Sequence, residues 1–150
     1  MKIYVSLIIP AYNEEQRIGE TLNKVLSYLE KQTYTWEVIV VDDGSTDKTS
    51  EIVSKYNNVK LIKFPHNRGK GAAVREGMLN ASGKYRIFTD ADLSTPIEDL
   101  ELMLYHLENG ADVCIGSREL DPTKLVLHQP KYRQFIGRLF RKIVDFFRFL

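Results

Sequence analysis

The sequence has little of several features that would assign it to a class directly. It has one cysteine in 150 residues, Cys114, which excludes an internal disulfide and suits a reducing compartment such as the cytosol. Its three histidines, His66, His106 and His128, lack the spacing of zinc ligands. No apolar run approaches the roughly 20 residues of a membrane-spanning helix, and Pro10 interrupts the N-terminal run too early for a secretory signal. We therefore expect a cytoplasmic protein that does not cross a membrane.

Two common nucleotide-binding patterns are also absent. Neither glycine cluster fits G-x-G-x-x-G or G-x-x-x-x-G-K-[ST], which argues against a dehydrogenase and against an NTPase. The net charge is +1, but residues 122–150 hold seven basic residues and one acidic residue, whereas the remaining 121 residues hold 14 and 19. Because the basic excess is confined to the C-terminal segment, no nucleic-acid partner is expected.

Apolar runs typical of buried strands alternate with helical patterns along a chain long enough for one sizeable core. The predicted strands are 4–9, 37–41, 59–64, a run that starts at Tyr85, and 112–116. The predicted helices are 14–31, one capped by Ser45 or Thr46 that carries Ile52, Val53 and Tyr56, one from Ala72 through Ala81, and 97–107. Nearly continuous apolar strands alternating with helices predict an α/β fold, with a mostly parallel sheet covered by helices on both faces.

A polar cluster follows each predicted strand. In parallel α/β sheets, ligands bind outside the carboxyl ends of the strands, so these clusters are expected on one rim. They are 10–15, Asp42 with Asp43, 68–71, Asp90 with Asp92, and Arg118. Taken singly, 42–45 also fits a turn with a helix cap, and 67–71 also fits an ordinary glycine-rich loop.

Asp90 and Asp92 end the fourth predicted strand. Being two residues apart, they share a face of an extended chain and come within reach of one divalent cation. Mg²⁺ and Mn²⁺ take oxygen ligands and are often held by one or two carboxylates together with substrate phosphates. The pair therefore indicates a phosphate-bound metal site, and the alternative is two solvated acids at the start of a loop.

Five segments together carry a family resemblance. They are IIPAYNEE, IVVDDGSTDKT, NRGKGAAVREG, TDADLSTP and IGSR, in this order within residues 5–118. In these the chain resembles family 2 glycosyltransferases of the Rossmann-like GT-A fold. The loop 67–75 and the segment 90–96 look most like the hexosyltransferases that move a sugar from a nucleotide donor to a polyprenyl phosphate, such as dolichyl or undecaprenyl phosphate.

The resemblance implies a set of donor-binding residues and a metal. Asp90 and Asp92 would bind Mg²⁺ or Mn²⁺, and Ser94, where mannose-type relatives often have Gln, favours glucose and hence UDP-glucose as donor. Arg68 would face the base or the phosphates of the nucleotide. The residues expected at the donor are Pro10, Ala11, Tyr12, Glu14, Asp42, Asp43, Arg68, Lys70, Asp90 and Ala91.

The expected chemistry needs cations more than a base. Departure of the nucleotide diphosphate leaves negative charge that a metal held by Asp92 and a guanidinium can stabilise. A phosphate monoester has a second pKa of about 6, so it is already largely a dianionic nucleophile at pH 7. Arg118 and Arg133 are the expected ligands of that acceptor phosphate, with an ordinary surface arginine as the alternative for Arg133. The expected transfer is metal-dependent and inverting. Rival functions are a transferase acting on a sugar or peptidoglycan-type alcohol, which needs an additional base, and a non-catalytic nucleotide-sugar-binding module.

The C-terminal segment is the last informative stretch. On a helical wheel, residues 137–150 carry basic side chains on one arc and Phe, Leu, Ile and Val on the other, with Phe149 as the exception. This pattern predicts an amphipathic helix that lies peripherally on the cytosolic face of a membrane, and packing in a homodimer is the alternative. We therefore expect a nucleotide-sugar-binding domain at 1–120, an acceptor-side segment at 121–150, and a chain that is truncated relative to the family.

Overall fold

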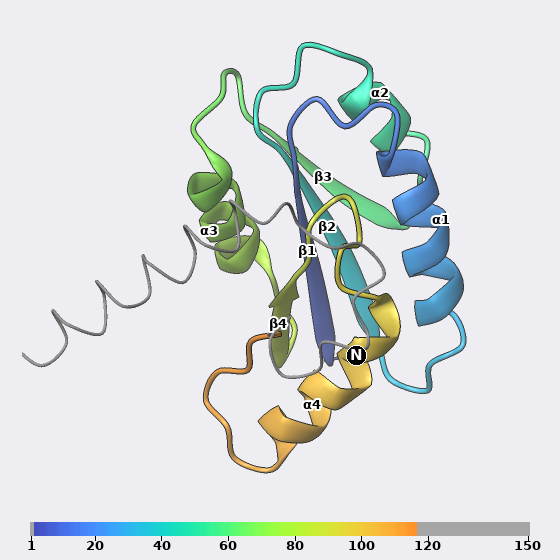
Figure 1. Ribbon diagram of the computed structural model, residues 1–150, viewed down its shortest axis with the longest axis vertical. Helices are drawn as coiled ribbons and strands as arrows, with labels where there is room; N and C mark the ends of the chain where they lie inside the picture. The colour runs from blue at the N-terminus through green and yellow to red at the C-terminus, as the bar shows by residue number, and fades with distance from the viewer. Residues whose placement is uncertain (1, 117–150) are drawn as a thin grey trace, which may run out of the picture. The chain divides into compact units, whose positions relative to one another are not determined.

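A parallel sheet forms the centre of the computed structural model, which describes residues 2–116 (Figure 1). Its strands are β1 (Val5–Ala11), β2 (Trp36–Asp42), β3 (Val59–Lys63) and β4 (Tyr85–Phe88). They lie in the order β3-β2-β1-β4, and each neighbouring pair is parallel. The predicted α/β fold with a parallel sheet is therefore confirmed.

The two central strands are mostly apolar because both of their faces are covered. All seven residues of β1 are buried, and Ile8 of β1 lies opposite Ile39 of β2. Side chains alternate along a strand, so Val5 and Leu7 enter one core while Ile8 enters the other. This double burial produces the continuous apolar run in the sequence.

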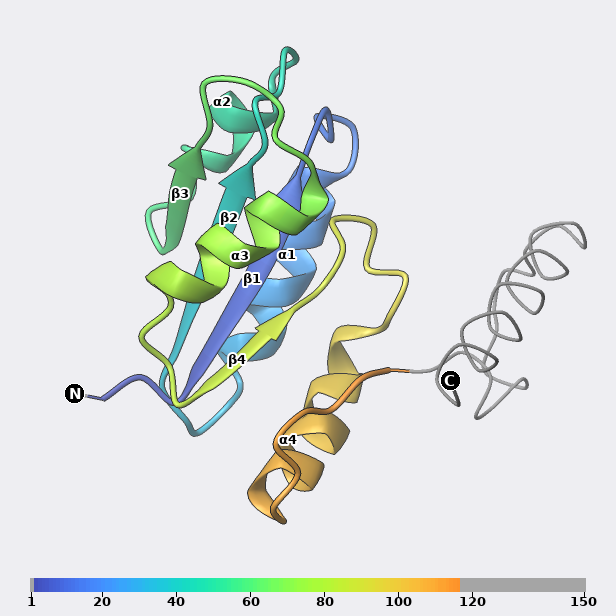
Figure 2. The ribbon, with the colours of Figure 1, turned by 90° about the vertical axis from the view of Figure 1, so that its left-hand side faces the viewer.

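Helices cover both faces of the sheet (Figure 2). On one face pack α1, α2, the short 3₁₀ turn η1 and α4, and on the other packs α3. Their bounds are α1 Ile18–Leu29, α2 Thr49–Val53, α3 Lys70–Asn80, η1 Ile97–Asp99 and α4 Leu100–Glu108. None of the helices within residues 2–116 is long and apolar enough to span a bilayer.

Small residues let α3 approach the sheet closely. Ala73 and Gly77 are its buried residues, and a Cβ added at Gly77 would lie 2.3 Å from Cγ2 of Ile8. The helix therefore rests on β1 and β2 with little side-chain volume between them. This close packing holds the first residue of α3, Lys70, near the carboxyl ends of the strands.

Tyrosine hydroxyls attach α4 to the first half of the chain. Tyr28 and Tyr34 both donate to Oε1 of Glu101, at 3.0 and 2.8 Å, and Tyr4 donates to Glu108. Burial first, and then the hydrogen bond to Glu101, raise the pKa of Tyr28 to about 12. These donors therefore stay protonated across the physiological pH range.

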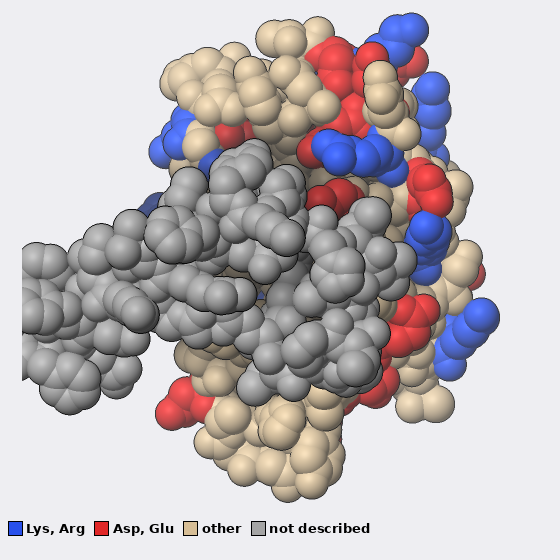
Figure 3. Space-filling view, in the orientation of Figure 1, with Lys and Arg blue, Asp and Glu red and all other residues tan. Residues whose placement is uncertain are grey.

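Acidic and basic side chains are interspersed along the exposed side of α1 and α2 (Figure 3). Lys24 pairs with Glu20 at 2.7 Å, and Lys55 pairs with Glu51 at 3.5 Å. Both are exposed helical pairs four residues apart, and such pairs contribute only a few tenths of a kcal/mol each. They mark a solvated surface, so substitutions in these pairs are suitable controls for substitutions at buried or cleft-lining residues.

The start of α1 and the cap of α2 differ from the prediction. Helix α1 begins at Ile18, because residues 14–17 form a turn. The predicted cap at Ser45 or Thr46 is wrong, since α2 begins at Thr49 and Oδ1 of Asp47 accepts the Thr49 amide at 2.9 Å. Both predicted caps instead hold Asn13 in the preceding loop, so they are not free to cap the helix.

The predicted fifth strand at 112–116 is also wrong. Val113 and Ile115 are 78% and 80% exposed, and the described sheet has four strands. Gly110 ends α4 with φ 97°, and the Ala111 amide donates to the His106 carbonyl, which turns the chain back on the helix end. The apolar run thus meets neither sheet edge. The predicted helix at 137–150 lies outside the described residues.

Glu37 joins three segments at the end of the sheet opposite the predicted rim. Its Oε1 accepts from the Ser6 hydroxyl at 2.5 Å and from the amide and hydroxyl of Ser82 at 2.7 and 2.8 Å. Burial alone would raise the pKa of Glu37, but these hydrogen bonds outweigh it and lower the pKa. The ionised form is therefore the one that stabilises the fold.

We expect Glu37→Ala to lower the free energy of unfolding by about 1.5–3 kcal/mol at pH 7, because it removes hydrogen bonds to a charged acceptor. A lowered folded pKa means that this contribution is complete above the unfolded pKa of about 4.3 and is lost as the pH falls through the folded value. Urea unfolding at pH 7 and pH 3 measures it. The exposed variant Glu51→Ala is the control, and an equal loss in both variants would contradict the assignment.

Candidate functional site

A cleft of about 420 Å³ lies at the carboxyl ends of the strands. It is formed by the loops that follow β1, β2, β3 and β4, together with the start of α3. Its lining residues are Pro10, Ala11, Tyr12, Glu14, Asp43, Asn67, Gly69, Lys70, Ala73, Asp90, Ala91 and Asp92. The volume is within the range of small-molecule sites, and seven of the twelve lining residues are polar or charged.

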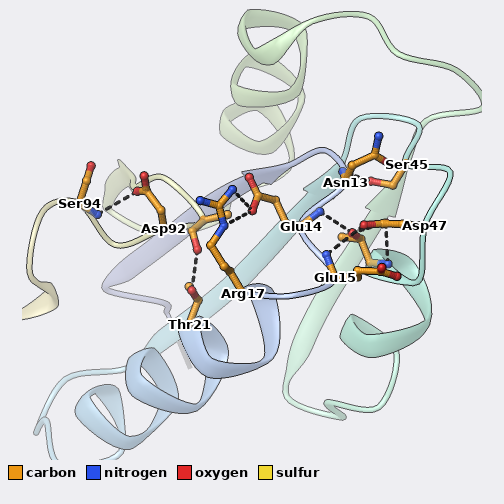
Figure 4. A network of polar contacts seen from close by, with 11 residues as sticks. Asn13, Glu14, Glu15, Arg17, Thr21, Ser45, Asp47, Asp92 and Ser94 are labelled. Atoms are coloured by element: carbon orange, nitrogen blue, oxygen red, sulfur yellow. Dashed lines mark hydrogen bonds and ion pairs between the residues drawn. The ribbon is translucent and has the colours of Figure 1, made fainter. Parts of the chain in front are cut away.

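Asn13 connects the loop after β1 to the loop after β2 (Figure 4). Its amide donates to the Ser45 hydroxyl at 2.9 Å, and its side-chain oxygen accepts the Thr46 amide at 2.9 Å. Asn13 adopts φ 54°, a left-handed conformation that asparagine tolerates better than most residues. This turn presents the neighbouring Tyr12 and Glu14 to the cleft.

The same two loops are also joined through the residues that directly follow Asn13. The Glu14 amide donates to the Thr49 hydroxyl at 2.8 Å, and the Glu15 amide donates to Asp47 at 3.0 Å (Figure 4). Burial works to raise the pKa of Asp47, but the bonds from Thr49 and the Glu15 amide lower it overall. Arg17 pairs with the Glu14 carboxylate at 2.7 Å. The Glu14 side chain is therefore held at the wall of the cleft.

Asp43 joins the loop after β2 to the loop after β3. It is 3% exposed, and its two oxygens accept the amides of Arg68 and Gly69 at 2.7 and 2.9 Å. Each carboxylate oxygen keeps a second lone pair for another donor. Gly44 follows with φ 72°, and a Cβ there would lie 2.4 Å from the His66 carbonyl carbon. The two loops thus touch through backbone, which only glycine permits at this position.

The segment Asp90–Asp92 turns sharply as it leaves β4. The Leu93 amide donates to the Asp90 carbonyl at 3.1 Å, Asp92 Oδ1 accepts the Ser94 amide at 2.9 Å, and Leu93 adopts φ 47°. The carbonyl of Ala91, between the two acids, accepts the hydroxyl of Thr21 from α1 at 2.5 Å (Figure 4). Thr21 and Ala91 are each 4% exposed. This buried contact with α1 therefore fixes the backbone between the two acids and with it the position of both carboxylates.

Thr21→Val is expected to loosen this segment, because it keeps the shape of the side chain and leaves the Ala91 carbonyl without its partner. We expect the divalent-cation-dependent part of UDP-glucose affinity to fall about three- to tenfold, while binding measured in chelator is unchanged. Calorimetry with Mn²⁺ and with EDTA separates the two parts. Thr21→Ser should restore the wild-type value. Thr35→Val, which removes a hydroxyl between Tyr4 and Lys2, is the distant control.

The donor set at Asp90 and Asp92 fits a hard divalent cation. Both carboxylates line the cleft, and the Lys70 ammonium lies 2.5 Å from Oδ1 of Asp90, so a positive charge is already stabilised there. Within residues 2–116 no group of three or more His, Cys, Asp or Glu side chains is arranged as a metal site. Two carboxylates would leave the other positions of an octahedral ion to water or to substrate phosphates, which is how Mg²⁺ is usually bound.

Eight of the ten residues predicted at the donor line the cleft, as does the second predicted metal ligand, Asp92, and the other two donor residues lie elsewhere. Asp42 is fully buried, and its carboxylate accepts from the Ser45 amide and the Ser50 hydroxyl. The Arg68 guanidinium lies over the Phe64 ring, 4.7 Å from its centroid, and is not part of the lining. Arg118 and Arg133 are outside the described residues.

Gly69 lies in the predicted rim cluster 68–71 and lines the cleft, whereas Asn67 and Ala73 line the cleft without having been predicted there. Asn67 directly precedes that cluster in the same loop, so its position held a signal. Ala73 lies one turn into α3, where its small side chain gave none.

A parallel sheet with helices on both faces and a cleft at its carboxyl ends defines a Rossmann-like α/β domain, and domains of this kind bind ligands outside their strand ends. The sequence profile described as "Glycosyl transferase family 2" matches residues 6–149. The chain belongs to this family, and the resemblance seen in the sequence is confirmed.

Curated relatives named dolichyl-phosphate beta-glucosyltransferase are 35–43% identical to the chain. The mouse protein of that name is 43% identical over 160 residues, which cover 95% of this chain and 49% of the relative. The chain spans less than half the length of these relatives, between 34% and 49%.

Two solved structures share the fold. A mannosyltransferase from Pyrobaculum calidifontis in complex with GDP-Man and Mn²⁺ is 31% identical, with a TM-score of 0.55 over 66% of this chain and 30% of that one. Glucosyl-3-phosphoglycerate synthase from Mycobacterium tuberculosis in complex with UDP is 26% identical, with a TM-score of 0.56 over 73% and 41%. Both likenesses confirm the GT-A type of fold.

Proposed function

We propose that the protein containing this chain transfers glucose from UDP-glucose to a polyprenyl phosphate such as dolichyl phosphate, with inversion and with a divalent cation. The observation that carries the proposal is the cleft, where nine residues expected to bind a nucleotide sugar or its metal come together from four loops. The names of the curated relatives support glucose and dolichyl phosphate.

Base and ribose are assigned to the side of the cleft formed by the loops after β1 and β2. Tyr12 is 46% exposed in the lining and offers a ring face for the base, while Glu14 and Asp43 offer acceptors for hydroxyl and imino groups. Pro10 and Ala11 provide a close backbone wall. Asp42 is left out of this assignment because its carboxylate is already occupied within its own loop.

The diphosphate is assigned to the opposite side, near Lys70, Asp90 and Asp92. Asp90 and Asp92 would hold Mg²⁺ or Mn²⁺, which supplies Lewis-acid stabilisation of the charge on the departing nucleotide diphosphate. Lys70 adds an ammonium that can donate to a phosphate oxygen. The chain's own contribution is to place the two carboxylates side by side at the cleft, with the Lys70 ammonium within reach, before the donor arrives.

The acceptor phosphate is assigned to Arg118 and Arg133. A phosphate monoester is mostly dianionic at pH 7, so its attack on the anomeric carbon requires alignment and charge neutralisation without proton removal. Guanidinium groups suit this role because they bind phosphate through two parallel hydrogen bonds. A transferase acting on a saccharide alcohol would need a general base in addition.

Calorimetric titration of the chain with UDP-glucose, UDP-galactose and GDP-mannose, each with Mn²⁺ and with EDTA, tests the proposal. The expected result is that UDP-glucose binds most tightly and that EDTA weakens the binding. Tighter binding of GDP-mannose would overturn the donor assignment, and equal binding with and without the metal would overturn the metal assignment.

We also propose that residues 137–150 bind the cytosolic face of a membrane as an in-plane helix. Fourteen residues of helix are about 21 Å long, too short to cross a hydrocarbon core of about 30 Å. Phe and Leu side chains supply the apolar part, and each basic residue adds about 1 kcal/mol at an anionic surface, which salt screens. Acceptor lipid and enzyme would then meet at one interface.

In liposome co-sedimentation, the chain is expected to pellet with anionic vesicles at low salt and to be partly released at high salt. Phe146→Ser together with Phe147→Ser should stay in the supernatant with an unchanged melting temperature. If the wild type ignores anionic vesicles, or if the double variant loses a dimer instead, the apolar face belongs to a protein interface.

A further inference from the structure

The ion pair between Lys70 and Asp90 differs from the other ion pairs in the described part of the chain. The other three each join residues three or four positions apart, within or at the start of a helix. Lys70 and Asp90 are twenty positions apart and come from the loops after β3 and β4. Their pair closes the diphosphate side of the cleft, and both side chains belong to its lining.

The position of Lys70 is fixed by its surroundings. It is the first residue of α3, directly after Gly69, whose φ is 91° and whose amide donates to Asp43. Helix α3 itself is held against β1 through Gly77. The ammonium therefore starts from a rigid base, and its flexible stem lets it move between partners a few ångströms apart.

One oxygen of Asp90 cannot serve a lysine and a divalent cation equally. With the 2.5 Å contact in place, a cation approaching Asp90 meets a positive charge at the position it needs. Asp92 has no such obstacle, because its Oδ1 accepts a backbone amide. A cation that binds through Oδ1 of Asp90 therefore requires Lys70 to leave that oxygen, and one that binds through Oδ2 lies close enough to the ammonium to be repelled by it.

We propose that Lys70 is an exchangeable counter-ion: it neutralises Asp90 in the empty cleft, is displaced by the divalent cation, and then pairs with the diphosphate of the donor. This inference rests on the function proposed above. It makes cation and nucleotide bind cooperatively, because a diphosphate gives the displaced ammonium a new anionic partner and the cation alone does not.

The nucleotide is expected to increase the affinity for the cation, and this increase can be measured. Without nucleotide, the cation must break the Lys70–Asp90 pair and then lie close to a free ammonium, so it binds weakly. With nucleotide, the same ammonium contacts phosphate oxygens, and both penalties disappear. Since coupling between two ligands is reciprocal, Mn²⁺ tightens UDP by the same factor as UDP tightens Mn²⁺.

Isothermal calorimetry of Mn²⁺ binding to the chain, without UDP and with saturating UDP, tests the inference in wild type and in Lys70→Met. In wild type, UDP should tighten Mn²⁺ at least about fivefold. In Lys70→Met, Mn²⁺ alone should bind about two- to fivefold more tightly than in wild type, as expected from the loss of one competing exposed ion pair. The coupling factor should shrink accordingly.

Lys24→Met is the matched control, because it removes an exposed lysine paired to a carboxylate at 2.7 Å on α1, outside the cleft lining. It should leave both Mn²⁺ affinities unchanged. If Lys70→Met binds Mn²⁺ alone no more tightly than wild type, or keeps the full coupling factor, the inference is overturned while the proposed function stands. If wild-type chain binds no Mn²⁺ even with UDP, the metal part of the proposed function fails instead.

Discussion

Asp92→Asn is expected to remove the Mn²⁺-dependent part of UDP-glucose binding. Asp92 lines the cleft, is exposed, and has no ion-pair partner among the residues described, so its charge is available to a cation. Loss of a supporting contact around a metal typically costs 10–100-fold in metal affinity, and replacing a charged ligand by a neutral amide should cost at least about as much. The amide oxygen can still accept from the Ser94 amide, so the turn should persist.

Titration of the variant with UDP-glucose in Mn²⁺ and in EDTA should give two equal affinities, both near the wild-type value in EDTA. The melting temperature should not change. Asp112→Asn, which replaces an exposed aspartate outside the cleft, serves as the control and should keep the full response to Mn²⁺. A variant that still responds fully to Mn²⁺ would show that Asp90–Asp92 is an ordinary loop.

Gly44→Ala is expected to have the largest effect on stability, a loss of more than about 3 kcal/mol. The added Cβ would lie 2.4 Å from the backbone of His66, and φ 72° is unfavourable for alanine. Backbone cannot give way like a flexible side chain, so the loops after β2 and β3 would have to separate. Asp43 would then lose its bonds to Arg68 and Gly69, and UDP binding should weaken together with stability.

Gly71→Ala provides the opposite case in the adjacent loop-to-helix segment. Gly71 lies inside α3, and a Cβ there meets nothing within 4 Å. Alanine is favoured over glycine in a helix by about 1 kcal/mol, so this variant should melt at a slightly higher temperature. Thermal unfolding of the two variants side by side measures both effects. Similar melting temperatures would mean that the contact between Gly44 and His66 does not hold the loops together.

The central part of the fold could be predicted because a strand buried on both faces has a nearly continuous run of apolar residues. Strands β1 and β2 are mostly apolar, and the carboxyl ends of parallel strands meet on one rim whatever the details of the loops. The run at 112–116 is also rich in apolar residues, but it pairs with no strand of the described sheet. An apolar run identifies a candidate strand, but it does not specify a neighbouring strand with which it can form hydrogen bonds.

The site could be predicted less completely than the sheet. Asp42 and Asp43 are adjacent and chemically identical, yet one is used inside its own loop and the other bridges to the next loop at the cleft. Only the direction of the turn after β2 separates them. Thr21 gave no signal at all, because a threonine on the buried side of an amphipathic helix looks like ordinary core packing. Contacts between distant segments determine both cases.

The central place of β1 also has a consequence for biosynthesis. Val5 pairs on one side with Trp36 and on the other with Tyr85, so β1, which is made before the other strands of the described sheet, receives its second neighbour only after β4 has emerged. Until then β1 presents an apolar strand with one unpaired edge, a known risk for aggregation of nascent chains. The α1–β2 segment can pair with it early and shield one side. The other edge waits for some fifty further residues of translation, which makes this interval the time when a nascent-chain chaperone would matter most.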